Sequence, residues 1–377
     1  MKPTLVIYLG RMDGTPAEEL VGRAQEALAI DNAELASETG LFREVLVFTD
    51  SEPKFPVPDG VIVERQDGSD FHFGQSLANL ISGWRPEAVV YLGGGFGPFI
   101  DQELLDEIVG RLARSDALVL ANNIFSADLV AFRPPEALFR VAPPARDNPL
   151  AQVLHRQAGL PIAELPRSAK TQFDLDTPTD LAVLKYHGVD RPRLGRLIAD
   201  APIETDRLEA AAAYLVEPYA EVVVAGRVSS YVLAYLERET ACRTRVFSEE
   251  RGMQADGREE RGQVRSVLGF LLEAVGVEGF FERVAQLGQA CFLDSRVLFA
   301  HLGLRLSRAD RFYSDLGEPE AVGDPLARRI TAAARAAPIP VVMGAHSLVS
   351  GGLYAVVDAA WRIHDQALLG QTYQQGR

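Results

Sequence analysis

The sequence contains very little cysteine. Cys242 and Cys291 are the only two among 377 residues, and Cys291 lies within an apolar run. Disulfide-stabilised folds need several cysteines and an oxidising compartment. Two isolated cysteines therefore argue against a disulfide framework and favour a reducing compartment, so we expect a cytoplasmic protein.

An excess of positive charge is also missing. The chain has 38 lysine and arginine residues against 52 aspartate and glutamate residues, which gives a net charge of -14. Proteins that bind nucleic acid or anionic membranes through their general surface need a basic field. We therefore expect no nucleic-acid partner and no membrane partner, although a local basic pocket for a phosphorylated metabolite is compatible with this charge.

Long apolar runs are absent as well. A membrane-spanning helix needs roughly 18 or more consecutive apolar residues, and no segment approaches that length. The first apolar run, Leu5–Leu9, is too short for a signal peptide and predicts a strand instead. Hydrophobic residues still make up 47% of the chain, so a sizeable core can form in each of two domains.

Several common catalytic patterns are missing. The chain has no Gly-x-Ser-x-Gly nucleophile elbow and no Walker loop. His155, His187 and His301 show no metal-binding spacing with cysteine or another histidine. The glycine cluster Gly93–Gly97 does not match the dinucleotide fingerprint, because no acidic residue follows at the expected strand end. These patterns therefore give no lead to the chemistry.

What the first half does show is a regular alternation of short apolar strands and helical segments. This alternation predicts a mainly parallel sheet covered by helices on both faces. The expected strands are Leu5–Tyr8, Glu44–Thr49, Val61–Glu64, Ala88–Leu92, Ala117–Ala121 and Leu129–Phe132. The segment Val189–Pro202, with its prolines, glycine and mixed charges, is the expected linker.

A second α/β unit is expected beyond this linker. Its predicted strands are Glu221–Ala225, Thr244–Phe247, Ala290–Leu293 and Ile339–Met343, and its predicted last helix is Leu353–Ile363. We therefore predict one α/β domain over residues 1–190, a second, Rossmann-like α/β domain over residues 203–365, and a polar tail over residues 366–377.

The most informative segment is Phe173–Leu181, which reads Phe-Asp-Leu-Asp-Thr-Pro-Thr-Asp-Leu. Its second part predicts a helix start, with Thr177 as the N-cap and Asp180 as its reciprocal partner. That helix start requires neither Asp174 nor Asp176, which precede it on the expected strand. Residues two apart on a strand point to the same face, so both carboxylates can face one cleft. A carboxylate there can hold a divalent metal against phosphate oxygens.

This segment resembles the closing motif of the small nucleotidyltransferases with the GT-A fold, in which a strand ends in Asp-Ile-Asp-Thr-Pro. It is most similar to the 2-phospho-lactate guanylyltransferases and the molybdenum-cofactor guanylyltransferases. Weaker likeness extends over residues 1–190, through Phe73–Leu77, Asp128–Pro135 and Asp147–Ala151. The resemblance implies a three-layer αβα GT-A domain that transfers a nucleotidyl group from a nucleoside triphosphate to a small phosphorylated acceptor.

The resemblance also implies where such a site lies. Mg²⁺ would be the cofactor, with Asp176 as its ligand and catalytic residue and Asp174 in support. The nucleotide would bind to two glycine-containing loops, although the first of these lacks the lysine that the families usually have. The implied nucleotide-binding residues are Gly10, Arg11, Gly14, Gly93, Gly94 and Gly95.

One departure from the families concerns the metal. They usually place a metal-binding aspartate two residues before a proline at the end of the central strand, and alignment on Pro98 puts Phe96 there. A phenylalanine cannot bind a cation. Two alternatives therefore stay open: a non-catalytic ligand-binding protein on a degenerate GT-A scaffold, and a GT-A sugar transferase that uses a nucleotide-sugar donor. A homodimer is compatible with the sequence.

In the second half, each of the four predicted strands is followed by polar residues. The carboxyl ends of parallel strands line the ligand crevice of an open sheet, so we expect a second ligand site there, with arginines that converge on an anion and an acid–base pair. Ordinary polar strand-to-helix turns are the alternative interpretation. The candidate residues are Arg227, Ser229, Arg251, Asp294, Arg296 and His346.

Overall fold

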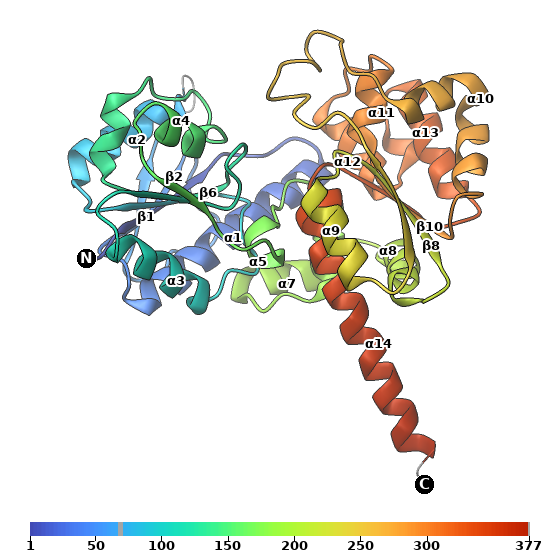
Figure 1. Cartoon of the computed structure of the whole chain (residues 1–377), viewed down its shortest axis with the longest axis horizontal. Coiled ribbons are helices and arrows are strands. Elements are labelled where there is room, and N and C mark those ends of the chain that lie inside the picture. Colours follow the sequence, from blue (N-terminus) through green and yellow to red (C-terminus); the bar gives the residue numbers. More distant parts are fainter. Residues whose placement is uncertain (67–70, 376–377) are drawn as a thin grey trace. The chain divides into compact units, whose positions relative to one another are not determined.

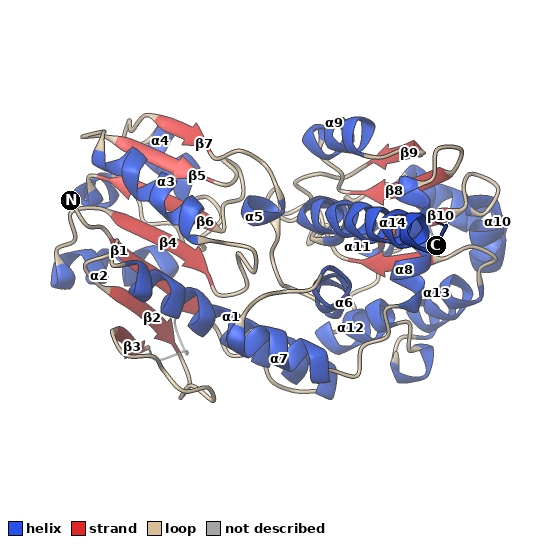
Figure 2. Cartoon of the chain, turned by 90° about the horizontal axis from the view of Figure 1, so that it is seen from below, coloured by secondary structure: helices blue, strands red, loops and turns tan. Residues whose placement is uncertain are grey.

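The computed structural model describes residues 1–66 and 71–375 (Figure 1). The strands form two separate sheets, and each sheet has its own helices (Figure 2). This arrangement confirms the predicted α/β class. No helix in the described part of the chain is long and apolar enough to cross a membrane. That the second sheet belongs to a Rossmann-like domain stays a prediction.

The chain divides into two compact units whose segments alternate along the sequence. The first unit comprises Met1–Asp13, Gly22–Leu175 and Val189–Leu197. The second comprises Gly14–Val21, Asp176–Gly188 and the chain from Ile198 onward. Beyond Gly22 the chain therefore crosses between the units after Leu175, after Gly188 and after Leu197, and the last crossing lies within the expected linker Val189–Pro202.

The first unit has a seven-stranded sheet in the order β3-β2-β1-β4-β6-β5-β7. Strand β6 runs antiparallel to its neighbours β4 and β5, and the other neighbouring pairs are parallel. The short strand β7 is missing from the sequence prediction. The strands are β1 (Thr4–Leu9), β2 (Val45–Thr49), β3 (Val61–Arg65), β4 (Val89–Gly93), β5 (Leu118–Ala121), β6 (Leu129–Arg133) and β7 (Ile162–Glu164).

Helices cover both faces of this sheet. The helices in this part of the chain are α1 (Pro16–Thr39), α2 (Phe73–Trp84), α3 (Gln102–Ala113), α4 (Leu150–Arg156) and α5 (Ala169–Gln172). Apolar side chains of α1 and α3 pack in the cluster on one face, and those of α2 and α4 pack on the other. Asp101 is the N-cap of α3, because its side chain accepts a hydrogen bond from the Leu104 N–H.

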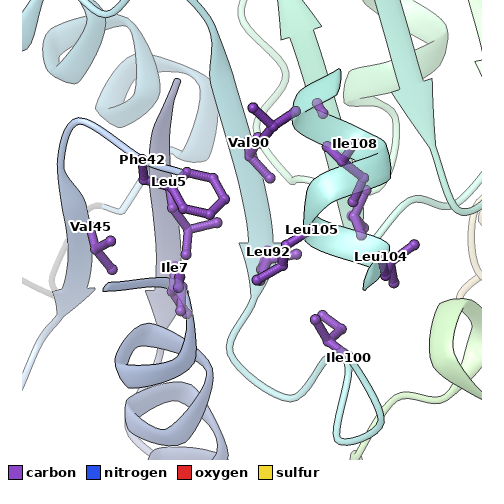
Figure 3. Close-up of a cluster of buried hydrophobic side chains, with 14 of the residues drawn as sticks. Leu5, Ile7, Phe42, Val45, Val90, Leu92, Ile100, Leu104, Leu105 and Ile108 are labelled. Atoms are coloured by element: carbon purple, nitrogen blue, oxygen red, sulfur yellow. The ribbon is translucent and has the colours of Figure 1, made fainter. Parts of the chain in front are cut away.

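The central strands alternate strictly between the two faces. Leu5 and Ile7 point into the α1–α3 side, as Figure 3 shows, whereas Val6 lies in the cluster on the α2–α4 side. Successive side chains of a strand point to opposite faces, so a strand covered on both faces must be apolar throughout. Strands β1 and β4 pair in parallel, so their carboxyl ends lie next to each other.

The second unit has a four-stranded, fully parallel sheet in the order β11-β10-β8-β9. Its strands are β8 (Glu221–Gly226), β9 (Arg243–Ser248), β10 (Ala290–Asp294) and β11 (Val341–Gly344). The remaining helices of the chain are α6 (Pro178–His187), α7 (Pro192–Asp200), α8 (Asp206–Ala213), α9 (Ser230–Glu239), α10 (Val267–Val284), α11 (Ser295–His301), α12 (Arg308–Leu316), α13 (Pro325–Ala336) and α14 (Leu353–Gln375).

Helix α6 explains why the chain first enters the second unit before the expected linker. It packs against α14, α8 and β11 of the second unit, and its Leu181 and Leu184 are fully buried. Apolar burial stabilises this arrangement by roughly 25 cal/mol per Å² of area removed from water. The helix that follows the acidic segment therefore belongs to the second unit.

Two predicted irregular segments are helical. The expected linker contains α7, because Pro192 stands at the first helical position, where its missing N–H costs nothing. The expected polar tail continues α14 to Gln375. Its alanine, leucine and glutamine residues favour a helix, and no proline interrupts it.

Candidate functional site

In the first unit, the loop Gly93–Gly97 pairs directly with the acidic segment. The Leu175 N–H donates to the Gly95 carbonyl at 2.8 Å, and Phe96 and Asp174 form an isolated antiparallel bridge. A Cβ atom on residue 95 would lie 2.6 Å from the Leu175 carbonyl oxygen and 3.1 Å from Asp174 Oδ1. Only glycine permits this approach, and it brings the Asp174 carboxylate against the glycine-rich loop.

Phe96 has a structural role at the position that the families give to a metal ligand. Its side chain is fully buried in the apolar cluster that contains Ile100 and Leu104. Its carbonyl oxygen accepts a hydrogen bond from Asn32 Nδ2 at 3.0 Å. Within residues 1–66 and 71–375, no three His, Cys, Asp or Glu side chains are grouped so that they could hold a metal by themselves.

Asp176 belongs to the second unit, whereas Asp174 belongs to the first. The Asp176 side chain is exposed, and its N–H donates to Asp180 Oδ2 at 3.0 Å. The predicted capping box is confirmed, since Asp180 also accepts from the Thr177 N–H at 2.8 Å. The helix start is therefore structural, and the two carboxylates before it lie outside it.

A buried tyrosine stands behind the glycine-rich loop. Tyr91, on β4, donates its hydroxyl proton to Asp147 Oδ2 at 2.5 Å. Burial raises the Tyr91 pKa well above its ordinary value, and the charges of Asp147, Asp128 and Asp174 raise it further. The hydroxyl therefore stays protonated among three carboxylates at the carboxyl end of β4. No pattern in the sequence singles out this tyrosine.

A pocket of about 240 Å³ lies at the carboxyl ends of β1 and β2. Arg11 lines it together with two cations that sequence reasoning did not single out, Arg23 and Lys54. The buried Glu26 fixes the β2 loop, because its Oε1 accepts from the N–H groups of Lys54 and Phe55. The residues that line the pocket are Leu9, Gly10, Arg11, Met12, Gly22, Arg23, Glu26, Ser51, Glu52 and Lys54.

Lys54 lines the same pocket as Arg11. It comes from another loop of the chain, so no local pattern could reveal it. The exposed Arg11 forms an ion pair with Asp13 at 2.5 Å. Gly14, the third residue expected in this loop, belongs to the second unit. Gly10 and Arg11 therefore line a cationic pocket, and Gly14 is assigned to a different compact unit.

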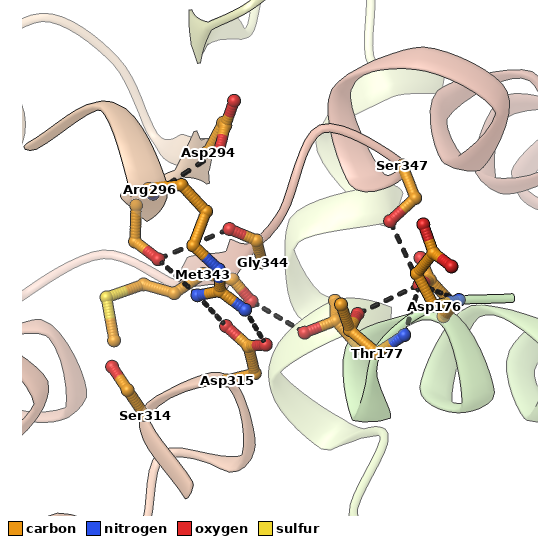
Figure 4. A network of polar contacts seen from close by, with 12 residues as sticks. Asp176, Thr177, Asp294, Arg296, Ser314, Asp315, Met343, Gly344 and Ser347 are labelled. Atoms are coloured by element: carbon orange, nitrogen blue, oxygen red, sulfur yellow. Dashed lines mark hydrogen bonds and ion pairs between the residues drawn. The ribbon is translucent and has the colours of Figure 1, made fainter. Parts of the chain in front are cut away.

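In the second unit, three of the candidate ligand residues, Arg227, Asp294 and Arg296, take part in two buried ion pairs. Asp294, fully buried, accepts from Arg227 Nε at 2.6 Å and from Arg227 Nη2 at 3.0 Å. Arg296 binds both carboxylate oxygens of Asp315, at 2.9 and 2.5 Å (Figure 4). These two arginines are therefore paired internally, in contrast to the expectation that they converge on an anion.

The other candidates at this edge have different surroundings. Ser229 caps α9, since its hydroxyl oxygen accepts from the Val232 N–H at 3.1 Å. Arg251 and His346 are exposed. Burial opposes ionisation of Asp294, but the charge and hydrogen bonds of Arg227 prevail and lower its pKa. Asp294 is thus an ionised partner of Arg227, and it is unsuited to proton transfer with His346.

Asp180 is an unusual buried acid. Besides the Asp176 and Thr177 donors, its Oδ2 accepts from Ser347 Oγ at 2.9 Å. Its Oδ1 has no hydrogen-bond partner among the described residues. Burial raises the pKa of Asp180 to about 7, and the charge of Asp176 adds to this. Asp180 therefore links the start of α6 to the turn after β11 through hydrogen bonds, although burial makes its ionised form unfavourable.

We expect stability to depend on this acid between pH 4 and 7. The unfolded chain loses the Asp180 proton near pH 3.8, whereas the folded protein keeps it to about pH 7. The free energy of unfolding should therefore fall as pH rises through this window, by a few kcal/mol. Urea unfolding of Asp180→Asn should show a flatter profile than the wild type, and the exposed Asp200→Asn should not. Parallel profiles of Asp180→Asn and the wild type would contradict this expectation.

Comparisons with known proteins give only distant likenesses. No family model matches this chain, and no curated protein matches it. A solved cytidylyltransferase from Leptospira borgpetersenii is 18% identical and covers 53% of this chain and 93% of its own, with a TM-score of 0.38. A 2-C-methyl-D-erythritol 4-phosphate cytidylyltransferase from Thermus thermophilus is 17% identical over 46% of this chain and 93% of its own, with a TM-score of 0.30.

Another likeness covers more of the chain at a lower sequence identity. S. aureus TarS, residues 1–349, is 11% identical and covers 80% of this chain and 88% of its own, with a TM-score of 0.32. Nucleotidyl transferases thus occur among the similar solved structures over about half of the chain. With identities and TM-scores this low, the assignment of a function depends on the side chains described above.

Proposed function

We propose that the first unit binds a nucleoside triphosphate and transfers its nucleotidyl group to a small phosphorylated acceptor. The observation that supports this most directly is the Asp174 carboxylate against Gly95, at the carboxyl edge of β4. Ligands of open α/β sheets bind at such edges. A carboxylate beside a glycine backbone, which a ligand can approach closely, suits a metal ion that also binds phosphate oxygens.

The cationic pocket supports the same proposal. Arg11, Arg23 and Lys54 line a space at the ends of β1 and β2, and β1 is the direct neighbour of β4. Arginine forks and lysine ammonium groups both bind phosphate oxygens. The triphosphate would bind in this pocket, with Gly10 giving its backbone room to approach.

The described residues fit a magnesium ion that is held partly by its substrate. Mg²⁺ commonly binds through one or two carboxylates plus phosphate oxygens rather than through an all-protein cage. Asp174, with Asp176 two residues on, would supply these carboxylates, which is compatible with the absence of a three-ligand group in the described part of the chain. The ion would neutralise charge on the phosphates during transfer.

The side chains of this chain would then position the reactants. Arg11 and Lys54 would hold the phosphates that leave as pyrophosphate, and no covalent enzyme intermediate is needed. The Tyr91–Asp147 hydrogen bond would keep the carboxyl end of β4 rigid. Most of the rate of phosphoryl-type transfer comes from such positioning and charge neutralisation.

Phe96 favours a second candidate, a ligand-binding protein without catalysis on the same scaffold. Phe96 is buried at the position where the families have a metal-binding aspartate, so one carboxylate of the usual metal site is missing. Such a protein would bind a nucleotide through Arg11 and Lys54 without needing Mg²⁺. A GT-A sugar transferase stays the third alternative, and a screen of nucleotide-sugar donors would test it.

Calorimetric titration of the full chain with each of the four ribonucleoside triphosphates, with Mg²⁺ and with EDTA, separates the first two candidates. Saturable binding that needs Mg²⁺ supports the transferase. Binding of equal strength in EDTA supports the non-catalytic protein. Absence of binding under both conditions contradicts both.

We also expect Gly22→Ala to damage the pocket. A Cβ atom at this position of α1 would lie 2.2 Å from the Met12 carbonyl oxygen, so the Gly10–Met12 loop would have to move. Overpacking of this kind costs roughly 1–3 kcal/mol of stability, and nucleotide binding should weaken with it. Gly83→Ala in α2 is the control, because no atom lies within 4 Å of its new Cβ. Equal effects of the two substitutions in urea unfolding and titration would count against this role for Gly22.

A further inference from the structure

Helix α1 holds the glycine-rich loop and the acidic segment through two side-chain amides. Gln25 Nε2 donates to the Leu175 carbonyl oxygen at 2.7 Å, and Asn32 Nδ2 donates to the Phe96 carbonyl oxygen at 3.0 Å. Residues spaced as Gln25 and Asn32 are lie on one face of a helix, two turns apart. Both sides of the bridge between Phe96 and Asp174 are therefore fastened to the same helix.

The Gln25 bond completes the backbone hydrogen bonding of Leu175, the residue that directly follows Asp174. The Leu175 side chain is fully buried, and its N–H donates to the Gly95 carbonyl oxygen at 2.8 Å. A carbonyl oxygen that is removed from water needs a donor of its own. Gln25 supplies this donor, and its amide thereby fixes the main chain next to the Asp174 carboxylate.

The amide and the carboxylate meet beside Gly95. A Cβ atom on residue 95 would lie 3.1 Å from Gln25 Nε2 and 3.1 Å from Asp174 Oδ1. Ala29 lies between Gln25 and Asn32 on the same face of α1 and is buried in the core of the sheet. Its short side chain lets the helix backbone approach the loop closely. Without the Gln25 amide, the Leu175 carbonyl could move, and Asp174 would move with it.

The same stretch of α1 also contributes to the cationic pocket. Gly22, Arg23 and Glu26 line that pocket, and Gln25 lies among them in the sequence. An α-helix is a rigid element, because each turn is hydrogen-bonded to the next. Helix α1 therefore holds the pocket and the Asp174 carboxylate at a fixed separation. A magnesium–triphosphate group has to meet both at once, so this separation decides how well it fits.

We propose that Gln25 is a positioning residue, which fixes the Asp174 carboxylate relative to the triphosphate pocket through the Leu175 carbonyl. This inference rests on the nucleotide function proposed for the first unit. Residues that orient a metal ligand typically change metal affinity 10- to 100-fold when they are lost. Gln25 acts through the main chain, so its loss weakens the metal-dependent part of nucleotide binding and leaves the phosphate contacts of Arg11 and Lys54 intact.

Calorimetric titration of the full-length Gln25→Met variant tests this role, with the tightest-binding of ATP, GTP, CTP and UTP as the probe. Methionine keeps the length of the side chain and removes its amide. We expect the dissociation constant in Mg²⁺ to rise about tenfold. In EDTA at low ionic strength, where Arg11 and Lys54 bind the triphosphate most strongly, the variant should match the wild type.

Two further variants serve as comparisons. Gln25→Ala loses the same hydrogen bond together with more side-chain volume, so its effect should equal that of Gln25→Met. Gln102→Met is the matched control, because it makes the same change at an exposed glutamine of α3 in the same unit. Its binding should equal that of the wild type. Urea unfolding of each variant confirms that it is folded during the titrations.

Three outcomes would overturn the inference while magnesium-dependent binding by the wild type leaves the proposed function standing. The first is an unchanged dissociation constant of Gln25→Met in Mg²⁺. The second is equal weakening in Mg²⁺ and in EDTA, which would make Gln25 a structural residue of the pocket. The third is weakening in Gln25→Ala alone, which would assign the effect to packing. Wild-type binding that does not depend on Mg²⁺ would overturn the proposed function, and this inference with it.

Discussion

Asp174→Asn is expected to abolish magnesium-dependent nucleotide binding by the full chain. The carboxylate lies at the Gly95 backbone, where the proposed ion would meet the phosphates. Loss of residues that merely orient a metal ligand costs 10- to 100-fold in affinity, so we expect loss of the ligand itself to cost at least ~100-fold. Titration with the best-bound nucleoside triphosphate, with and without Mg²⁺, measures the effect.

Asp176→Asn and Asp116→Asn complete this experiment. Asp176→Asn should weaken binding in the same metal-dependent way if both carboxylates serve the ion. Asp116 has a fully exposed side chain that forms a surface ion pair with Arg133 at 3.8 Å. Such pairs contribute about 0–1 kcal/mol, so its neutralisation should leave nucleotide binding unchanged. Unchanged magnesium-dependent binding in Asp174→Asn would exclude this carboxylate as a ligand and leave the non-catalytic alternative favoured.

Asp294→Ala should cause the largest loss of stability. The substitution leaves the Arg227 guanidinium buried without its partner, which typically costs 3–5 kcal/mol. The midpoint of urea unfolding should fall accordingly, with an unchanged m-value. Arg329→Ala is the matched control, since it breaks the exposed Arg329–Glu278 pair, and such pairs contribute about 0–1 kcal/mol.

Two further measurements distinguish loss of the Arg227–Asp294 ion pair from the loss of side-chain volume at residue 294. The double variant Arg227→Met/Asp294→Leu removes both charges and should recover most of the lost stability. Arg227 lowers the pKa of Asp294 in the folded state, so the stability that it contributes is present above pH 3.8 and is lost as pH falls through the folded pKa. If Asp294→Ala costs no more than Arg329→Ala, the pair does not stabilise the edge.

The strands and the helix starts could be predicted because they depend on neighbouring residues. Alternation of apolar residues gave the six predicted strands of the first sheet, apart from their exact ends. Thr177, Pro178 and Asp180 define a helix start by local hydrogen bonds that form wherever this sequence occurs. Strand β7 was missed because three half-buried residues show too little periodicity.

The candidate sites were harder to predict, because long-range partners decide them. Arg227 and Arg296 look like free anion ligands in the sequence, yet Asp294 and Asp315 neutralise them from other elements. Lys54 joins Arg11 only because β2 pairs with β1 in parallel. The unit boundary after Leu175 depends on where α6 buries its leucines, which no composition shift marks.

The sequence by itself determined the α/β class, the capping box at Thr177 and the meeting of acidic and glycine-rich segments as a hypothesis, since these follow from periodicity and local chemistry. Only the tertiary structure decided that Phe96 fills the core, that Asp174 lies at Gly95, and that Arg227 and Arg296 are already paired. Burial and ion pairing depend on residues far apart in the chain, and packing alone brings them into contact.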